Sequence, residues 1–269
     1  MISDQRSDLY IQRNFQRASG YFTGAVIVIA VLVLAGWKWD VEFLRRPLFG
    51  TAAMNPATAL CLLLAGISFW LTENKPHLRY AGAFCAVVVM LAALLRLGSL
   101  YRGFPFQVDL ILFRQEIKVL PGGHARDRMS ISGAICLLLI AVSLLLLYAK
   151  TSRGQTISQL LALMAGLPAL FSIMGYIYRV KEFYGFFRYL PMSVHTAVCV
   201  MLLTLGILCA RPEKGIMSDV TTRLSGSILA RALIPVAILV PVVLGLLRLY
   251  GYWAGVFSTE FGVTILMLS

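Results

Sequence analysis

Long apolar stretches separated by short polar ones dominate this chain of 269 residues. Runs of about 20 apolar residues are long enough to cross a bilayer, and they are continuous rather than alternating, which favours helices over strands. We therefore predict an all-α fold, a polytopic membrane bundle of about eight helices. The expected helices cover residues 21–37, 55–71, 79–101, 129–148, 157–178, 193–209, 228–250 and 261–268.

One eight-residue pattern recurs at the start of every second apolar run. Three copies, which we call octets, share Met at the first position, Ala at the sixth and Cys at the eighth. A fainter fourth copy has Gly262 and Thr264 in place of the shared Ala and Cys. The octets occupy residues 54–61, 129–136, 192–199 and 257–264. This recurrence predicts one helical hairpin used four times, with each octet beginning the second helix of its hairpin.

The second octet position holds residues that cap helix N-termini well: Asn55, Ser130, Ser193 and Ser258. Their side-chain oxygens can accept a hydrogen bond from a free backbone N–H of the first turn. N-capping is therefore their expected role. Because the octets begin equivalent helices, we expect all of them at one end of the bundle, called the octet end below.

Composition agrees with a membrane protein. The chain is 59% hydrophobic and 13% charged, whereas soluble domains carry about 25% charged residues. The net charge of +12 comes from Lys and Arg scattered over many loops. That pattern suits the anionic headgroups of a lipid bilayer and argues against nucleic-acid binding. We expect a polar N-terminal tail at residues 1–19, for which an amphipathic segment on the membrane surface is one interpretation, and a membrane module at residues 20–269.

The fourth octet position varies most and supplies the candidate site: Ala57, Ser132, His195 and Glu260. Ionisable residues near or within a membrane point to function. If the repeats are equivalent, His195 and Glu260 approach each other or a common ligand, with Ser132 at the same depth. The alternative is that the ionisable pair is simply solvated at the interface.

Two arginines extend this candidate ligand-binding site. Arg96 and Arg248 each lie within two turns of the helix end that we place at the octet end. They could pair with Glu260, bind an anionic headgroup or ligand, or extend to the interface as long cationic side chains do.

No catalytic residues are assigned. The chain lacks a P-loop, the zinc-protease and serine-hydrolase motifs, and the dinucleotide fingerprint, so its standing as an enzyme is left open. The five cysteines lie inside apolar runs and form no CxxC pair, which favours a packing role over disulfides or metal. The three histidines fall in different contexts and do not suggest a bis-histidine haem; no cofactor is identified.

The last apolar run, residues 261–268, is too short for a span that needs about 20 residues. We expect it to continue beyond Ser269 into a domain absent from this chain. Lys and Arg in the loops lean slightly towards cytoplasmic termini.

Several segments resemble the N-terminal multi-pass membrane region of bacterial signalling proteins. They are residues 175–178, 192–197, 206–215, 229–235, 241 and 245–249. In such proteins, this region precedes PAS or GAF domains and then a histidine kinase or diguanylate cyclase output. The resemblance implies a sensory input module in a bacterial inner membrane, acting as a homodimer on a ligand that it does not identify.

The first hypothesis is therefore a membrane sensor, which reads a stimulus at the octet end and passes it through the last helix. A small membrane transporter or a membrane-bound enzyme is the alternative, because repeated hairpins also build transporters. A dimerising anchor that needs no ligand is a third possibility.

Overall fold

The computed structural model describes residues 2–46, 53–99, 129–147, 151–178 and 192–221. Within these ranges, the secondary structure is entirely helical, which confirms the predicted all-α class. The elements are α1 (Ile2–Lys38), α2 (Glu42–Arg45), α3 (Pro56–Asn74), the 3-10 helix η1 (Pro76–Leu78), α4 (Arg79–Gly98), α6 (Ile131–Leu147), α7 (Ser152–Tyr178), α9 (Val194–Ala210) and α10 (Ile216–Thr221).

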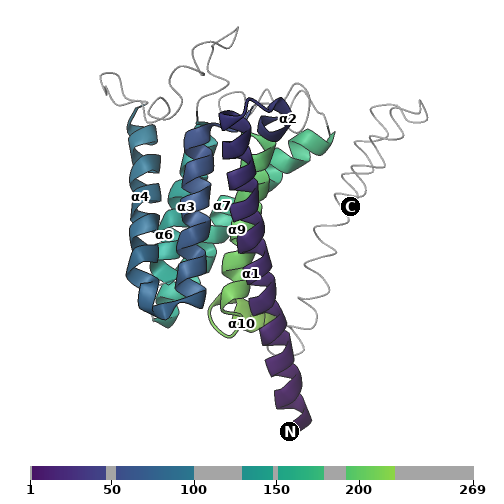
Figure 1. Ribbon diagram of the computed structural model, residues 1–269. Helices are drawn as coiled ribbons and strands as arrows, with labels where there is room; N and C mark the ends of the chain where they lie inside the picture. Colours follow the sequence, from purple (N-terminus) through teal and green to yellow (C-terminus); the bar gives the residue numbers. More distant parts are fainter. Residues whose placement is uncertain (1, 47–52, 100–128, 148–150, 179–191, 222–269) are drawn as a thin grey trace, which may run out of the picture.

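The six long helices form a closed ring of three hairpins (Figure 1). Three inner helices, α3, α6 and α9, contact one another. Each outer helix lies between two inner ones: α4 between α3 and α6, α7 between α6 and α9, and α1 between α9 and α3. Contact between α1 and α9 thus joins the first described hairpin to the last, so every long helix has a neighbour on both sides.

Among the residues that the structure describes, four helices are long and apolar enough to cross a membrane: Gln12–Lys38, Pro56–Asn74, Arg79–Gly98 and Arg153–Ile177. The chain is therefore a multi-pass membrane protein. Large apolar side chains such as Val28, Phe84 and Phe171 are exposed on the outer helices, where a bilayer supplies their apolar surroundings. The inner helices α6 and α9 are shorter, at 17 residues each, which corresponds to about 26 Å.

Helix boundaries differ from the expected ones mainly near the ends. Helix α1 runs unbroken from Ile2 to Lys38 and so includes most of the expected polar tail at residues 1–19. Its N-terminal part extends past the other helices (Figure 1). Helix α7 begins at Ser152, before the start expected at residue 157, and continues through Pro168. The short helices α2 and α10 lie in segments that we expected to be loops.

Part of the prediction falls outside the described residues. This applies to the connection at residues 102–128, the expected helices at 228–250 and 261–268, and the fourth octet. The fourfold repeat thus stays a prediction.

The core is built mainly from small side chains, which allow the helices to approach closely. A Cβ added at Gly66 would lie 2.8 Å from Cγ1 of Ile27 in α1, and one at Gly206 would lie 2.9 Å from Cε1 of Phe69 in α3. Cys61, Cys136 and Cys199 are buried in the same core, in the packing role expected of them.

Candidate functional site

The three described octets each begin an inner helix with a side-chain cap. Asn55 Oδ1 accepts a hydrogen bond from Ala57 N at 2.8 Å. Ser130 Oγ accepts one from Gly133 N at 3.0 Å, and Ser193 Oγ accepts one from Thr196 N at 3.3 Å. The N-cap prediction is therefore confirmed at α3, α6 and α9, because each cap satisfies a donor that the first helical turn leaves free.

A second contact recurs at the residue before each cap. The backbone carbonyls of Met54, Met129 and Met192 each accept a hydrogen bond from the outer helix of the same hairpin. The donors are Trp37 Nε1 at 2.9 Å, Arg96 Nε at 2.8 Å and Tyr176 OH at 2.5 Å, in that order. Each donor thus fixes the entry of an inner helix against the last turns of its outer helix.

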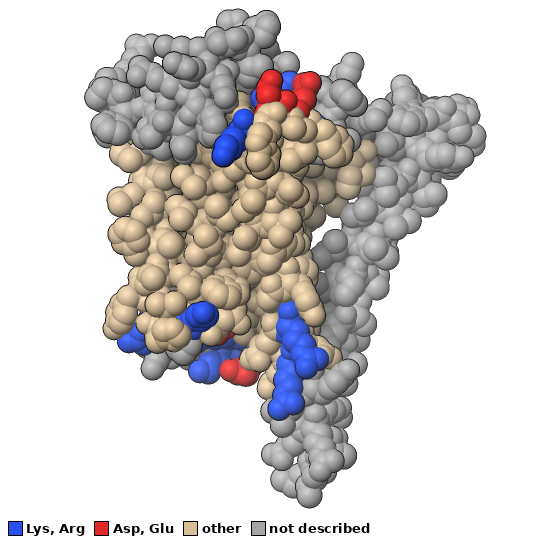
Figure 2. Space-filling model, viewed as in Figure 1, with Lys and Arg blue, Asp and Glu red and all other residues tan. Residues whose placement is uncertain are grey.

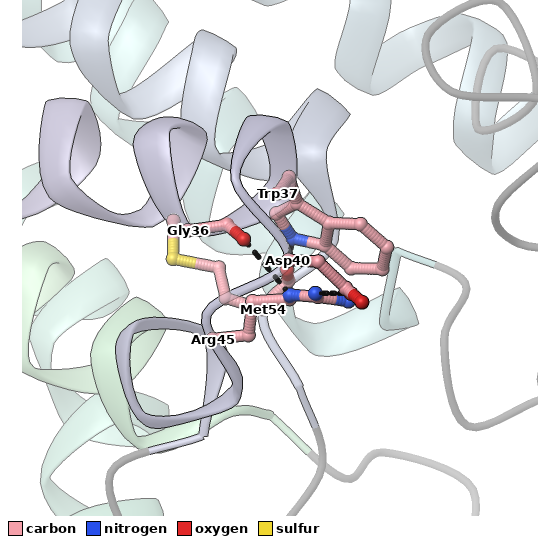
Figure 3. Close-up of polar contacts among 5 residues, drawn as sticks. All are labelled: Gly36, Trp37, Asp40, Arg45 and Met54. Carbon is pink, nitrogen blue, oxygen red and sulfur yellow. Dashed lines mark hydrogen bonds and ion pairs between the residues drawn. The ribbon is translucent and has the colours of Figure 1, made fainter.

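The first of these contacts belongs to a larger cluster shown in Figure 3. Arg45 Nε donates to the Gly36 carbonyl at 3.0 Å, and its guanidinium pairs with Asp40 and stacks 4.9 Å from the centre of the Trp37 ring. Met54 N donates back to the Arg45 carbonyl at 3.3 Å. These bonds hold α2 against the end of α1 and against Met54, the residue at which the first octet begins.

Ser132 is buried in the first turn of α6, and its Oγ lies 3.5 Å from Ser130 Oγ. One turn further, Cys136 Sγ donates to the Ala165 carbonyl of α7 at 3.4 Å. Because residues four apart share a helix face, Ser132 lies on the side of α6 that faces α7.

His195 is half-buried in the first turn of α9, and its Nδ1 is buried without a hydrogen-bond partner in the structure described. Residues eleven apart face nearly the same way on a helix, so His195 shares its side of α9 with Gly206, which packs against Phe69 of α3 and Phe22 of α1. His195 and Ser132 therefore share a depth but face different neighbours. The first turns that carry them do meet: a Cβ on Gly133 would lie 3.8 Å from Thr196 Cγ2.

The Arg96 guanidinium forms hydrogen bonds within the protein. Besides Met129, its guanidinium donates from Nη1 to Ser99 Oγ at 3.0 Å, so it ties α4 to α6 at the octet end. Glu260 and Arg248 lie outside the described residues, and the pairing expected between Glu260 and Arg96 or His195 stays a prediction.

The opposite end of α9 is held by a glutamine. Gln159 of α7 donates from Nε2 to the Lys214 carbonyl at 3.0 Å and accepts from Met217 N at 3.3 Å, on Oε1. Gly215 lies between them with φ of +68°, and a Cβ there would be 2.5 Å from Gln159 Oε1. Glycine is thus required in this turn, which leads from α9 to α10.

Sequence reasoning missed the donors to the octet carbonyls. Trp37 and Trp39 end the first expected helix, where aromatic residues often mark the membrane interface. Trp37 is nevertheless 1% exposed and bonded to Met54, whereas Trp39 is 69% exposed. The available signal was position: Trp37, Arg96 and Tyr176 each lie in the last turns of the helix before an octet.

Among the described residues, no group of three or more His, Cys, Asp or Glu could hold a metal ion. Comparisons with protein-family models, with curated proteins and with solved structures find no match. The geometry of the octet end and of the Gln159 turn therefore carries the functional argument, and what it identifies is a multi-pass helical membrane protein.

Proposed function

We propose that the chain is the membrane-embedded input module of a bacterial signalling protein, passing a stimulus from the octet end to a cytoplasmic output domain. The observation that carries this proposal is the layout of α9. One end of α9 holds His195 with an unsatisfied Nδ1, and the other enters the turn held by Gln159.

His195 is suited to detect a stimulus because its buried Nδ1 has no hydrogen-bond partner in the structure described. A buried polar atom without a partner costs about 1 to 3 kcal/mol. A ligand or lipid group that supplies this hydrogen bond in one conformation favours that conformation, and such differential affinity is what shifts an equilibrium. Glu260 and Arg248 are proposed to contribute to the same ligand. Ser132, which faces α7, and Arg96, which ties α4 to α6, are proposed to position the neighbouring helices at the octet end.

Helix α9 is suited to transmit such a change. It packs against α1, α3, α6 and α7, and its far end is coupled to α7 through Gln159. Small movements of a rigid helix are a known route for signals across proteins. The segment at residues 206–215, which resembles bacterial signalling proteins, covers the end of α9 and this turn.

The closed ring gives the predicted fourth hairpin a different task from the other three. Since α1 lies beside α9 among the described helices, we propose a place outside the ring for the predicted fourth hairpin. That position suits an element that carries movement to an output domain and, as the resemblance implies, pairs with a second subunit.

The described charges favour a cytoplasmic N-terminal end. Among the described residues, basic side chains at that end outnumber those at the octet end, and cytoplasmic loops are enriched in Lys and Arg. The N-terminal end holds Arg13, Arg17, Lys75, Arg79, Arg153, Arg211 and Lys214, and the octet end holds Lys38, Arg45, Arg46 and Arg96.

The test uses the complete gene product in bacterial membranes. Autophosphorylation from ATP and conversion of GTP to a cyclic dinucleotide are measured for the wild type, His195→Ala and the matched control His77→Ala. His77 is exposed in η1 at the opposite end. We expect His195→Ala alone to change the output, with the membrane level of all three proteins unchanged on immunoblots.

Two results would count against the proposal. Equal output from His195→Ala and wild type removes His195 from the sensing site. A complete gene product with neither output activity overturns the input-module assignment and makes transport the next function to assay.

A further inference from the structure

We propose that the turn between α3 and α4 is a docking surface for anionic phospholipid headgroups. The surface consists of Trp70, Lys75, Arg79 and Tyr80, and we call it the basic aromatic turn. It joins two membrane spans through η1, at the N-terminal end of the bundle. The spans on either side place it at the depth of the headgroups.

Two cations in this turn lie over aromatic rings. Lys75 Nζ is 5.5 Å from the centre of the Trp70 ring, and Arg79 Cζ is 4.9 Å from that of Tyr80. Arg79 Nη2 also donates to Tyr80 OH at 3.0 Å. The rings are open to the surroundings, with Trp70 40% and Tyr80 74% exposed. Aromatic rings of this kind favour the membrane interface, so they hold both positive charges at headgroup level.

The nearest acidic side chain does not neutralise this surface. Glu73 pairs with Arg211 at 3.6 Å. Among the described residues, no carboxylate forms an ion pair with Lys75 or Arg79. The ammonium and guanidinium groups therefore keep donors available for phosphate oxygens.

The octet end offers a contrasting surface built from similar parts. Lys38 lies 6.0 Å from the centre of the Trp39 ring. Its neighbours include Asp40, which pairs with Arg45, and Glu42. Figure 2 shows acidic and basic side chains side by side at that end, and mostly Lys and Arg among the coloured residues at the other. The basic aromatic turn thus offers two cations that form no ion pair among the described residues, whereas the cations near Trp39 have Asp40 and Glu42 beside them.

The experiment uses tryptophan as the reporter. The full chain with Trp39→Phe and Trp253→Phe keeps Trp70 and the buried Trp37. It is reconstituted in phosphatidylcholine vesicles that contain a minor fraction of either brominated phosphatidylglycerol or brominated phosphatidylcholine, and fluorescence quenching is compared. We expect stronger quenching by the anionic lipid. Equal quenching by the two lipids overturns the proposal.

Two variants show whether the cations cause the preference. Lys75→Gln and Arg79→Gln, in the same background, should each reduce the relative affinity for phosphatidylglycerol roughly fivefold, the effect expected of one basic side chain near an anionic surface. The matched control keeps Trp39 instead, in a Trp70→Phe and Trp253→Phe background, and should show no lipid preference with or without Lys38→Gln. An unchanged preference in the Lys75 and Arg79 variants, or an equal preference at Trp39, contradicts the assignment.

Discussion

At the scale of single residues, the octet end depends on hydrogen bonds that meet at the start of each inner helix. A cap side chain accepts from the first turn, and an outer-helix side chain donates to the carbonyl just before the cap. Both bonds lie where a helix leaves backbone groups unpaired. Losing one donor therefore leaves a buried carbonyl without that partner.

Tyr176→Phe tests this arrangement with the loss of one hydroxyl. The Tyr176 OH donates to the Met192 carbonyl, and Met192 is 1% exposed. We expect the free energy of unfolding to fall by about 1 to 2 kcal/mol, measured as a lower midpoint of thermal unfolding in detergent. Tyr80→Phe is the control: Tyr80 is exposed, so its change should stay within about 0.5 kcal/mol. Similar shifts in both variants would show that the Met192 bond contributes no stability.

At the scale of elements, α7 is held against both its inner neighbours by small and polar residues. Ser158 Oγ donates to the Ser143 carbonyl of α6 at 2.8 Å, and Ser143 Oγ donates to the Ser158 carbonyl at 2.8 Å. On the other side, Thr204 Oγ1 of α9 donates to the Ala162 carbonyl at 3.0 Å. In a membrane, such close packing and interhelical bonding replace the hydrophobic drive available in water.

Two glycines of α7 give a matched prediction for this packing. A Cβ at Gly166 would lie 2.9 Å from Thr204 Cγ2, whereas one at Gly175 has nothing within 4 Å. Gly166→Ala should therefore separate α7 from α9 and destabilise the protein by about 1 to 3 kcal/mol. Gly175→Ala should stabilise it by roughly 0.5 to 1 kcal/mol, because alanine favours the helix. Thermal unfolding in detergent measures both; equal signs for the two changes would contradict this account.

At the scale of the whole molecule, the ring of three hairpins explains why outer and inner helices differ. Inner helices are surrounded by protein, as shown by the many fully buried residues of α6 and α9. Outer helices present large apolar side chains to the surroundings. The ring also places connections at two ends of the bundle. The α3–α4 turn lies at the same end as the N-terminus, and α2 lies at the opposite end (Figure 1).

This arrangement predicts a labelling pattern in intact cells. Three single-cysteine variants are made in a chain without its native cysteines: Asp40→Cys, His77→Cys and Arg13→Cys, all at exposed positions. Asp40→Cys should react with a membrane-impermeant maleimide from outside. His77→Cys and Arg13→Cys should react only after the membrane is opened, because both lie on the proposed cytoplasmic side. The reverse pattern would show that the bundle has the opposite orientation in the membrane. Labelling of all three from one side would show that α1 and α3 do not cross the membrane.

Much of the fold could be predicted because membrane helices are encoded locally. Continuous apolar runs give spans wherever they occur, and a cap such as Asn55 or Ser193 needs only its own first turn. The short helix α2 was missed because it depends on the distant contacts of Arg45 with Gly36 and Met54. For the candidate site, sequence predicted a common depth for Ser132 and His195, but periodicity could not assign each side chain a neighbour.

The sequence by itself determined the membrane setting, the all-α class and the start of the inner helices, since each follows from residues close together in the chain. Only the tertiary structure decided that α1 closes the ring against α9. It also decided that Trp37, Arg96 and Tyr176 donate to octet carbonyls, and that Ser132 and His195 face different helices. These features depend on how helices far apart in sequence rotate and pack against one another, and a local pattern of apolar residues does not specify that rotation.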